Sequence, residues 1–242
     1  MATNIQQTNS QQPATQQQQG PIERVASGLD KMAAKIKPIL PGHITFDKFR
    51  RTVMTALHND PGILDGDRQS LFNACIEAAQ DGLMPDGREG ALVIYKTKNK
   101  QSGQFVKRVQ WMPMVNGIIK KVRQSGEIAR LNAFVVRERD HIVCRLGEDM
   151  KLEHEPVLFG ERGDVIGVYA VAKFHDGSID FEPMSIEDVE HIRQRSRAKD
   201  SGPWVSDWAE MARKTAIRRL AKRLPMSTEA DKAMRRDDAL YE

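Results

Sequence analysis

ALVIYKTKNKQSGQFVKRVQWMPM, residues 91–114, is the stretch in which the hydrophobic pattern changes from a helical period to a strand period. Apolar and β-branched residues fill Ala91–Tyr95 and Val106–Met114, and the turn-forming Ser102 and Gly103 lie between them. Two such runs on either side of a polar turn predict a β-hairpin with a long tip. The chain is therefore not expected to be all-helical.

The tip of this hairpin is basic and has no carboxylate between its first and last cation. Because alternate residues of a strand share a face, the lysines of the first arm are expected on one side, and the cations of the second arm approach them. A charged tip is often only a soluble sheet edge, but the lack of acidic residues favours contact with a polyanion. The candidate residues are Lys96, Lys98, Lys100, Lys107 and Arg108.

Outward from the hairpin, helices are expected before it and a mixture of strands and helices after it. Helical spacing of apolar residues covers 22–36, 45–58 and a segment from 67 or 70 to 81, where Gly82 stands in a C-cap position. After the hairpin, helices are expected over 115–124 and 186–195, and strands over 128–137, 141–146, 165–174 and 179–183. The pattern predicts an α+β fold, an antiparallel sheet with a β-hairpin flanked by helices.

A second stretch, residues 193–223, reads RQRSRAKDSGPWVSDWAEMARKTAIRRLAKR and is strongly basic. From Ser206 to Leu224 the pattern is helical, with Ser206 as the expected N-cap and Pro225 as the stop. Like charges four residues apart destabilise a helix unless an anion compensates them. DNA phosphates are such anions, so the cationic stripe favours DNA. The stripe consists of Lys214, Arg218 and Lys222.

Two tryptophans interrupt this basic stretch, and each has two interpretations. Trp208 lies on the apolar face of the expected helix, which favours a place in the core over a contact with DNA. Trp204 precedes the expected N-cap, where it could pack onto the first helical turn as a hydrophobic staple or stack on a base. Both interpretations of Trp204 stay open at this point.

Further cations complete the predicted DNA-binding set. Those near the end of helix 115–124 are weaker evidence, because cations at a helix C-terminus are favourable in any case. The additional residues are Lys120, Lys121, Arg123, Arg193, Arg195, Arg197, Lys199, Arg213 and Arg219, with Trp204 as the aromatic candidate. No catalytic or metal-binding residue is predicted.

The composition limits the class of protein. Lys plus Arg is 37 and Asp plus Glu is 33, a net charge of +4, and 40% of the residues are hydrophobic, which allows a substantial core. Cys75 and Cys144 stand alone and far apart, so a disulfide framework is not expected, and burial is the default expectation for both thiols. Neither a signal peptide nor a run of membrane-spanning length is recognisable, so an intracellular protein is expected.

A tail is predicted at each end of the chain, with a helix and a core domain between them. Residues 1–20 contain eight glutamines, and such a segment buries too little apolar surface to offset chain entropy, so a disordered tail is expected. Residues 21–40 contain a short amphipathic helix that could contact a neighbouring subunit or pack back on its own domain. A core domain over 41–225 and a loose charged tail over 226–242 complete the prediction.

Several chemistries do not fit the sequence. None of the 17 glycines precedes a lysine, so a Walker A loop cannot occur and an ATP-driven recombinase of the RecA type is excluded. The nearest approach to a metal site is a set of adjacent acid–histidine pairs, and neighbours in a strand point to opposite faces. We therefore expect neither a required cofactor nor an enzyme. The pairs are Asp140-His141, His154-Glu155 and His175-Asp176.

The basic stretch also carries a family likeness. GPWVSDWAEMARKTAIRRLAKRLP, residues 202–225, closely resembles the C-terminal signature of RecT-type phage single-strand annealing proteins. LFNACIEAAQDGLMPDG and GIIKKVRQSGEIARLNAFVVRERD are similar to two further blocks of that family, so the likeness spans roughly residues 40–225. The family commonly has Gly-Tyr where this chain has Met114-Val115, so a stacking role of that tyrosine does not carry over.

The resemblance implies an ATP-independent protein that binds single-stranded DNA, pairs complementary strands into annealed duplex and assembles into rings or helical filaments. It also implies a phage or prophage protein in the bacterial cytoplasm, acting beside a 5′→3′ exonuclease and the host single-strand binding protein. No cofactor would be required, and Mg²⁺ would assist only by stabilising the duplex product. The residues themselves indicate single-strand binding, so a passive single-stranded DNA-binding protein and a nuclease accessory remain alternatives.

Overall fold

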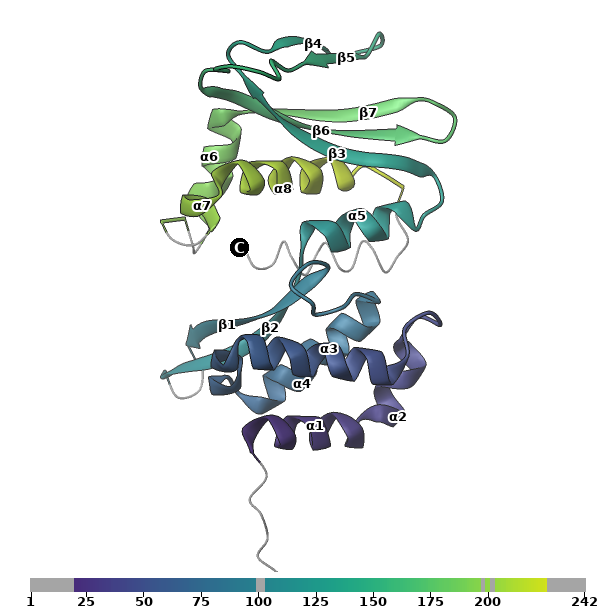
Figure 1. The fold of residues 1–242 in the computed structure, drawn as a ribbon, viewed down its shortest axis with the longest axis vertical. Helices are drawn as coiled ribbons and strands as arrows, with labels where there is room; N and C mark the ends of the chain where they lie inside the picture. The colour runs from purple at the N-terminus through teal and green to yellow at the C-terminus, as the bar shows by residue number, and fades with distance from the viewer. Residues whose placement is uncertain (1–19, 99–102, 197–198, 201–202, 226–242) are drawn as a thin grey trace, which may run out of the picture.

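The protein is described by a computed structural model over residues 20–98, 103–196, 199–200 and 203–225. Figure 1 shows two lobes stacked along the longest axis of the molecule, with the chain running from the lower lobe to the upper one. The tails predicted over 1–20 and 226–242 lie outside the described residues, except for Gly20. Lys100 and Arg197 lie outside them as well.

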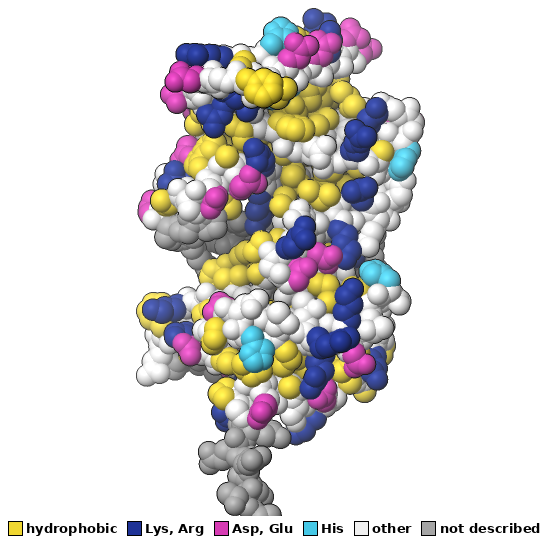
Figure 2. Space-filling model, in the orientation of Figure 1, with side chains coloured by type: hydrophobic (Ala, Val, Ile, Leu, Met, Phe, Trp, Pro, Cys, Tyr) yellow, Lys and Arg dark blue, Asp and Glu magenta, His cyan; other side chains and the backbone are white. Residues whose placement is uncertain are grey.

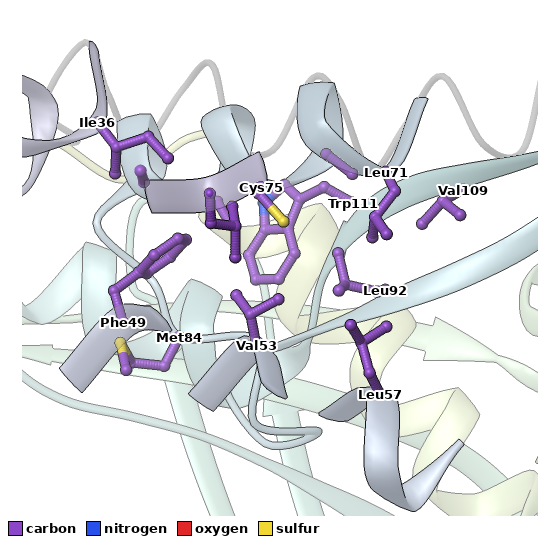
Figure 3. Packing of buried hydrophobic residues seen from close by; sticks show 14 of the residues in the cluster. Ile36, Phe49, Val53, Leu57, Leu71, Cys75, Met84, Leu92, Val109 and Trp111 are labelled. Atoms are coloured by element: carbon purple, nitrogen blue, oxygen red, sulfur yellow. The ribbon is translucent and has the colours of Figure 1, made fainter. Parts of the chain in front are cut away.

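The N-terminal lobe combines helices with one antiparallel pair of strands around a hydrophobic cluster. Trp111 lies near the middle of that cluster, and Figure 3 shows it close to Cys75. The Trp111 side chain is 1% exposed, and its Nε1 donates a hydrogen bond to Oδ2 of the buried Asp81 at 2.7 Å. The polar atom of this buried indole therefore has a partner. The elements are α1 (Pro21–Lys31), α2 (Ala33–Ile36), η1 (Lys37–Ile39), α3 (Phe46–Asn59), η2 (Pro61–Asp65), α4 (Arg68–Asp81), β1 (Gly90–Lys98) and β2 (Phe105–Pro113).

Side-chain caps begin α3 and α4 where the sequence predicts them. Thr45 Oγ1 accepts a hydrogen bond from Lys48 N at 3.3 Å, and Asp67 Oδ2 accepts one from Ser70 N at 2.8 Å. Of the two predicted starts of α4, the one after Asp67 is therefore correct. The helix ends at Gly82, whose φ of 63° is the left-handed conformation that glycine adopts without strain.

The first helical segment packs back on its own lobe. Val25, Leu29 and Ile36 are at most 2% exposed and belong to the N-terminal cluster. Asp30 forms an ion pair with Arg50 of α3 at 2.7 Å. Of the two possibilities left by the sequence, packing within the chain is the one in the structure, so the apolar face of this segment is not free to contact a neighbouring subunit.

The C-terminal lobe is built on an antiparallel sheet with strand order β3-β6-β7. The last long helix lies across one face of this sheet and contacts each of its strands, and α5 packs against β3 and that helix. A second hydrophobic cluster fills the space between them. The elements are α5 (Val115–Arg123), β3 (Ile128–Arg137), β4 (His141–Arg145), β5 (Lys151–Glu155), β6 (Val165–Phe174), β7 (Ile179–Ser185), α6 (Ile186–Arg195), α7 (Pro203–Ser206) and α8 (Trp208–Ala221).

The α+β class with antiparallel sheets is confirmed, but the prediction of one sheet is wrong. In the described part of the chain, β1–β2, β3-β6-β7 and β4–β5 form separate sheets, and the first belongs to the other lobe. Strand β5 was not predicted because its sequence, KLEHE, is mostly polar. It pairs with β4 as a hairpin at the upper end of the molecule in Figure 1.

The two cysteines differ in environment. Cys75 is buried as expected, and burial raises the pKa of its thiol to about 12, so the reactive thiolate is scarce at neutral pH. The expectation of burial is wrong for Cys144, which is exposed on β4. The β4–β5 hairpin stands apart from both hydrophobic clusters, so a strand residue there is not covered by a core.

The helix predicted from Ser206 begins two residues later, at Trp208, and a separate short helix precedes it. Trp204 lies within the short α7, and α8 begins after Asp207, to whose Oδ2 the Ser206 hydroxyl donates at 2.6 Å. Ser206 is therefore not the N-cap of α8. The helix ends at Ala221 rather than at the proline. The buried face of α8 includes Ala212, Ala216, Ile217 and Leu220.

Candidate nucleic-acid interface

Strand pairing places cations of both hairpin arms on one face. Lys96 lies directly opposite Lys107, and both are exposed. Lys98 pairs with Phe105, two residues further along each strand. Arg108 is exposed on the other face, opposite Tyr95. The charge of Lys107 is partly compensated, because its Nζ lies 2.9 Å from Asp65 Oδ2.

Phe105 is an exposed aromatic residue within this basic face, and the sequence reasoning did not single it out. Its exposed fraction is 72%. An aromatic ring among cations is the arrangement by which single-stranded nucleic acid is held, since bases stack and phosphates are neutralised. The sequence did contain an indication of this position, because Phe105 is two residues from Lys107 and alternate residues of a strand lie on one side. We call Lys96, Phe105 and Lys107 the hairpin face.

The cations of α5 are mostly engaged within the protein. Lys120 Nζ pairs with Glu89 Oε1 at 2.7 Å, and the other oxygen of Glu89 accepts from Met84 N at 2.9 Å. Lys121 is 9% exposed, so its assignment as a surface contact for DNA is wrong in this structure. Arg123 is exposed at the end of the helix and remains a candidate.

Around the end of α6, one arginine has a structural role. Arg193 Nε donates to the carbonyl of Lys199 at 2.9 Å, and its Nη1 lies 3.4 Å from Glu190. This arginine holds the polypeptide after α6 in place, so it is a weaker candidate for a phosphate than the sequence suggested. Arg195 is exposed, and Lys199 donates to Gln194 at 3.2 Å.

Acidic residues of β7 and α6 compensate the cations on one side of α8. Arg219 Nε lies 2.8 Å from Glu182 Oε1, and Arg223 pairs with the same carboxylate. Glu182 is 7% exposed. Because a buried carboxylate needs a compensating charge, its ion pairs with the two arginines have a structural role. Arg213 pairs with Glu210 one turn earlier. Arg219 and Arg213 are therefore weaker candidates than the sequence suggested, because their charges are already balanced.

The stripe predicted on α8 is separate from the ion pairs of Arg219 and Arg223, but Lys214 lines the same groove as the paired Arg213 and Glu210. Lys222 is exposed, and Lys214 and Arg218 are half-buried. Lys214 lines a groove of about 300 Å³ between α8, α5 and the edge strand β3, together with Ile119 and Ile217. The structure thus places one member of the stripe in a groove between elements that are distant in the sequence.

The structure decides between the two interpretations of Trp204. Its side chain is 2% exposed and belongs to the hydrophobic cluster of the C-terminal lobe. A ring without an exposed face cannot stack on a base, so the stacking interpretation is wrong for this conformation. Trp208 is half-buried against the same cluster, as favoured from the sequence, and its Nε1 donates to Glu190 Oε1 at 2.6 Å.

One buried polar cluster joins residues that the sequence reasoning had treated as separate pairs. Asp140, with a fully buried side chain, lies 3.2 Å from His154 Nε2, and His154 Nδ1 lies 3.1 Å from Tyr169 Oη. Arg162 Nη2 pairs with Asp140 at 2.5 Å, and this guanidinium holds the pKa of the Asp140 carboxyl well below its usual range. Burial raises the pKa of Tyr169 to about 12.

The surface charges are unevenly distributed. Figure 2 shows Lys and Arg side chains along one side of the visible face, over both lobes, and a mixture of acidic and basic side chains at the upper end. In the part of the chain that the structure describes, no group of His, Cys, Asp and Glu could hold a metal ion. Among the same residues, each helix is too short or too polar to span a bilayer.

Comparisons with known proteins point to one family. The sequence pattern of the RecT family matches residues 47–242, a range that contains every predicted DNA-binding residue. The chain is also similar to Protein RecT of Escherichia coli (strain K12). The two sequences are 40% identical over 211 residues, which cover 86% of this chain and 77% of the relative.

Proposed function

Because the chain belongs to the RecT family, whose members are single-strand annealing proteins of DNA recombination, we propose that it pairs complementary strands without hydrolysing a nucleotide. The family match over residues 47–242 is the observation that carries this proposal. Base pairing itself supplies the free energy, about 1.4 kcal/mol per base-pair step from stacking, so no other source is needed. Sequence specificity then lies in the paired bases and not in the protein.

The surface of the protein supports the binding half of this function. Two DNA strands repel each other, so an annealing protein must neutralise phosphates while it leaves the bases free to pair. The hairpin face offers two cations and an exposed ring, and Arg123, Arg195 and Lys222 add exposed cations on other elements. We propose these residues, with Lys214 and Arg218, as the principal DNA contacts.

Annealing also requires partners. We propose that subunits assemble along the DNA, since one 27.3 kDa chain covers only a short run of nucleotides. A 5′→3′ exonuclease would expose the strands, and host single-strand binding protein would coat them first. Mg²⁺ would act on the duplex product and would not be held by the protein.

Fluorescence annealing of complementary oligonucleotides without ATP tests the proposal. The expected result is annealing that is much faster than the spontaneous reaction and leaves both strands at full length. A protein that coats the strands without accelerating their pairing would instead be a passive single-stranded DNA-binding protein. Shortened strands in the presence of Mg²⁺ would favour a nuclease role.

The cationic stripe of α8 gives a first quantitative prediction. Changing Lys214, Arg218 and Lys222 together to alanine is expected to weaken single-strand binding and to lower its salt slope by up to about 2, because each phosphate contact contributes about 0.7. Fluorescence anisotropy at several salt concentrations measures the slope. Arg219→Ala provides a comparison at an exposed cation of the same helix whose ion pair with Glu182 is at 2.8 Å. An unchanged slope in the folded triple variant would remove α8 from the interface.

The exposed ring of the hairpin face gives a second prediction. Phe105→Ala is expected to weaken single-strand binding by about 1–3 kcal/mol, the range for removal of a base-stacking aromatic side chain. Its salt slope should stay unchanged, because no charge is lost. Stability should change little, since the side chain is 72% exposed. Val205→Ala, which removes a similarly exposed apolar side chain from α7, is the control. Equal affinities of the two variants would exclude stacking by Phe105.

A further inference from the structure

The loop between β5 and β6 exposes two large apolar side chains next to each other. Phe159 is 92% exposed and Leu158 is 77% exposed. We call this pair the apolar knob. Large apolar side chains that protrude together from a folded surface mark sites of interaction more often than a single exposed leucine does. The knob belongs neither to the hairpin face nor to the cationic stripe of α8.

Both ends of the knob loop are fastened to one buried carboxylate. Before the knob, Val157 N donates to Asp140 Oδ1 at 3.1 Å, and after it, Arg162 Nε donates to the same oxygen at 2.9 Å. Arg139 N also donates to the carbonyl of Arg162 at 3.1 Å. A loop held at both ends loses little conformational entropy when it binds, so the knob is pre-organised for docking.

The surroundings of the knob are acidic. Glu155, Glu161 and Asp164 are exposed on β5 and in the loop, whereas the exposed Glu153 pairs with Lys151 at 3.0 Å. Of the arginines nearby, Arg162 pairs with Asp140, and Arg139 lies 3.9 Å from Glu161. Arg137 donates to the carbonyl of Gly163 at 2.9 Å. Such a surface repels DNA and attracts a surface that carries cations beside an apolar depression.

The N-terminal lobe of the same chain has a surface of this kind. A cleft of about 510 Å³ lies between α3, η2 and the segment that leads into β1. Its lining includes the apolar residues Ala56, Ile63, Pro85 and Leu92, and the exposed cations Lys48 and Arg51 of α3. The volume lies within the range of about 300–1,000 Å³ that is usual for binding pockets.

Two carboxylates also line this cleft, and local turns occupy them in part. Asp60 Oδ1 accepts from Gly62 N at 3.1 Å. Asp86 Oδ1 accepts from the backbone N–H groups of Arg88 and Glu89, each at 2.8 Å. The amines and guanidinium groups of α3 are therefore the charged groups best placed to meet an acidic partner.

We propose that the apolar knob of one copy docks into this cleft on the next copy. Figure 1 shows the β4–β5 hairpin at the upper end of the long axis and α3 in the lower lobe, so one chain cannot make the contact with itself. Two different surfaces that join copies head to tail generate a ring if the rotation closes and a helical filament if it does not. The inference rests on the proposed function, for which it supplies the assembly contact.

Two one-sided variants of the full chain test this contact. The knob variant carries Leu158→Ser and Phe159→Ser, and the cleft variant carries Lys48→Glu and Arg51→Glu. Each alone is expected to raise the protein concentration needed for assembly by at least about tenfold, because hot-spot residues at interfaces cost this much or more. Sedimentation velocity with sequentially added complementary oligonucleotides measures assembly, and Val205→Ser is the control for loss of an exposed apolar side chain.

The mixture of the two variants distinguishes head-to-tail docking from other contacts. A knob variant retains its cleft and a cleft variant retains its knob, so the mixture is expected to form dimers and nothing longer. Unimpaired assembly of either variant, a mixture that stays monomeric, or a mixture that grows beyond dimers would each overturn the proposal. Binding of a short oligonucleotide should stay unchanged in both variants. Failure of the natural chain to anneal DNA would count against the proposed function instead.

Discussion

Replacing Trp204 with alanine is expected to lower the free energy of unfolding by about 3–5 kcal/mol, the loss typical of a buried large aromatic side chain. Trp204 is 2% exposed and shares a hydrophobic cluster with Ala212 and Ala216 of α8. Small alanine side chains cannot close the cavity that an indole leaves, so little of the loss is recovered by relaxation. Urea unfolding followed by circular dichroism measures the change.

Leucine at position 204 separates packing from stacking. Trp204→Leu keeps much of the apolar volume but removes the aromatic face, so it is expected to be more stable than the alanine variant and to bind DNA with natural affinity. Trp208→Ala serves as a comparison with a smaller expected loss, because Trp208 is only half-buried. A leucine variant of natural stability with DNA affinity weaker by about 1–3 kcal/mol would restore the stacking interpretation.

Asp140→Asn is expected to destabilise the protein by about 3 kcal/mol, the lower end of the loss when one partner of a buried ion pair is removed. The lower end applies because Arg162, the strongest partner, is 31% exposed and can be hydrated again. The variant should also loosen the knob loop, whose two ends bond to Asp140. Asp176→Asn is the control, since Asp176 serves only a local turn with Ser178.

The same carboxylate predicts a dependence of stability on pH. Arg162 and the backbone N–H groups of Arg137 and Val157 lower the pKa of Asp140 in the folded protein. In the unfolded chain this pKa is about 3.9. The contribution of Asp140 to stability is therefore fully present above pH 4 or so, and is lost as the pH falls toward the lowered folded value. Unfolding of the natural chain and of Asp140→Asn, compared between about pH 3 and pH 7, should show the difference between them shrinking at low pH. A constant difference would mean that the charge of Asp140 does not stabilise the fold.

Local features of the fold were predictable from the sequence. The helices expected from about residues 45, 67 and 186 begin there, each at a side-chain cap, because a cap is a contact between residues only three apart. The caps are Thr45, Asp67 and Ser185. Strand β5 could not be predicted in this way, since its polar sequence forms a strand only by pairing with β4. The start of α8 was also mistaken, because the segment around Trp204 turns to bury the indole.

For the candidate DNA-binding site, too, some features were predictable from the sequence and others depend on the tertiary structure. The runs of cations and the family signature are properties of the sequence, and they indicate a single-strand annealing protein of DNA recombination. Only the tertiary structure shows which of several predicted cations are paired with carboxylates or buried. Arg219 is compensated by Glu182 and Lys120 by Glu89, and Lys121 is buried. The physical reason is that runs of charge and hydrophobic periodicity depend on residues that are neighbours along the chain. The pairing of a cation with a carboxylate, the burial of a lysine and the exposure of Phe105 depend instead on residues that folding brings together from distant strands and helices.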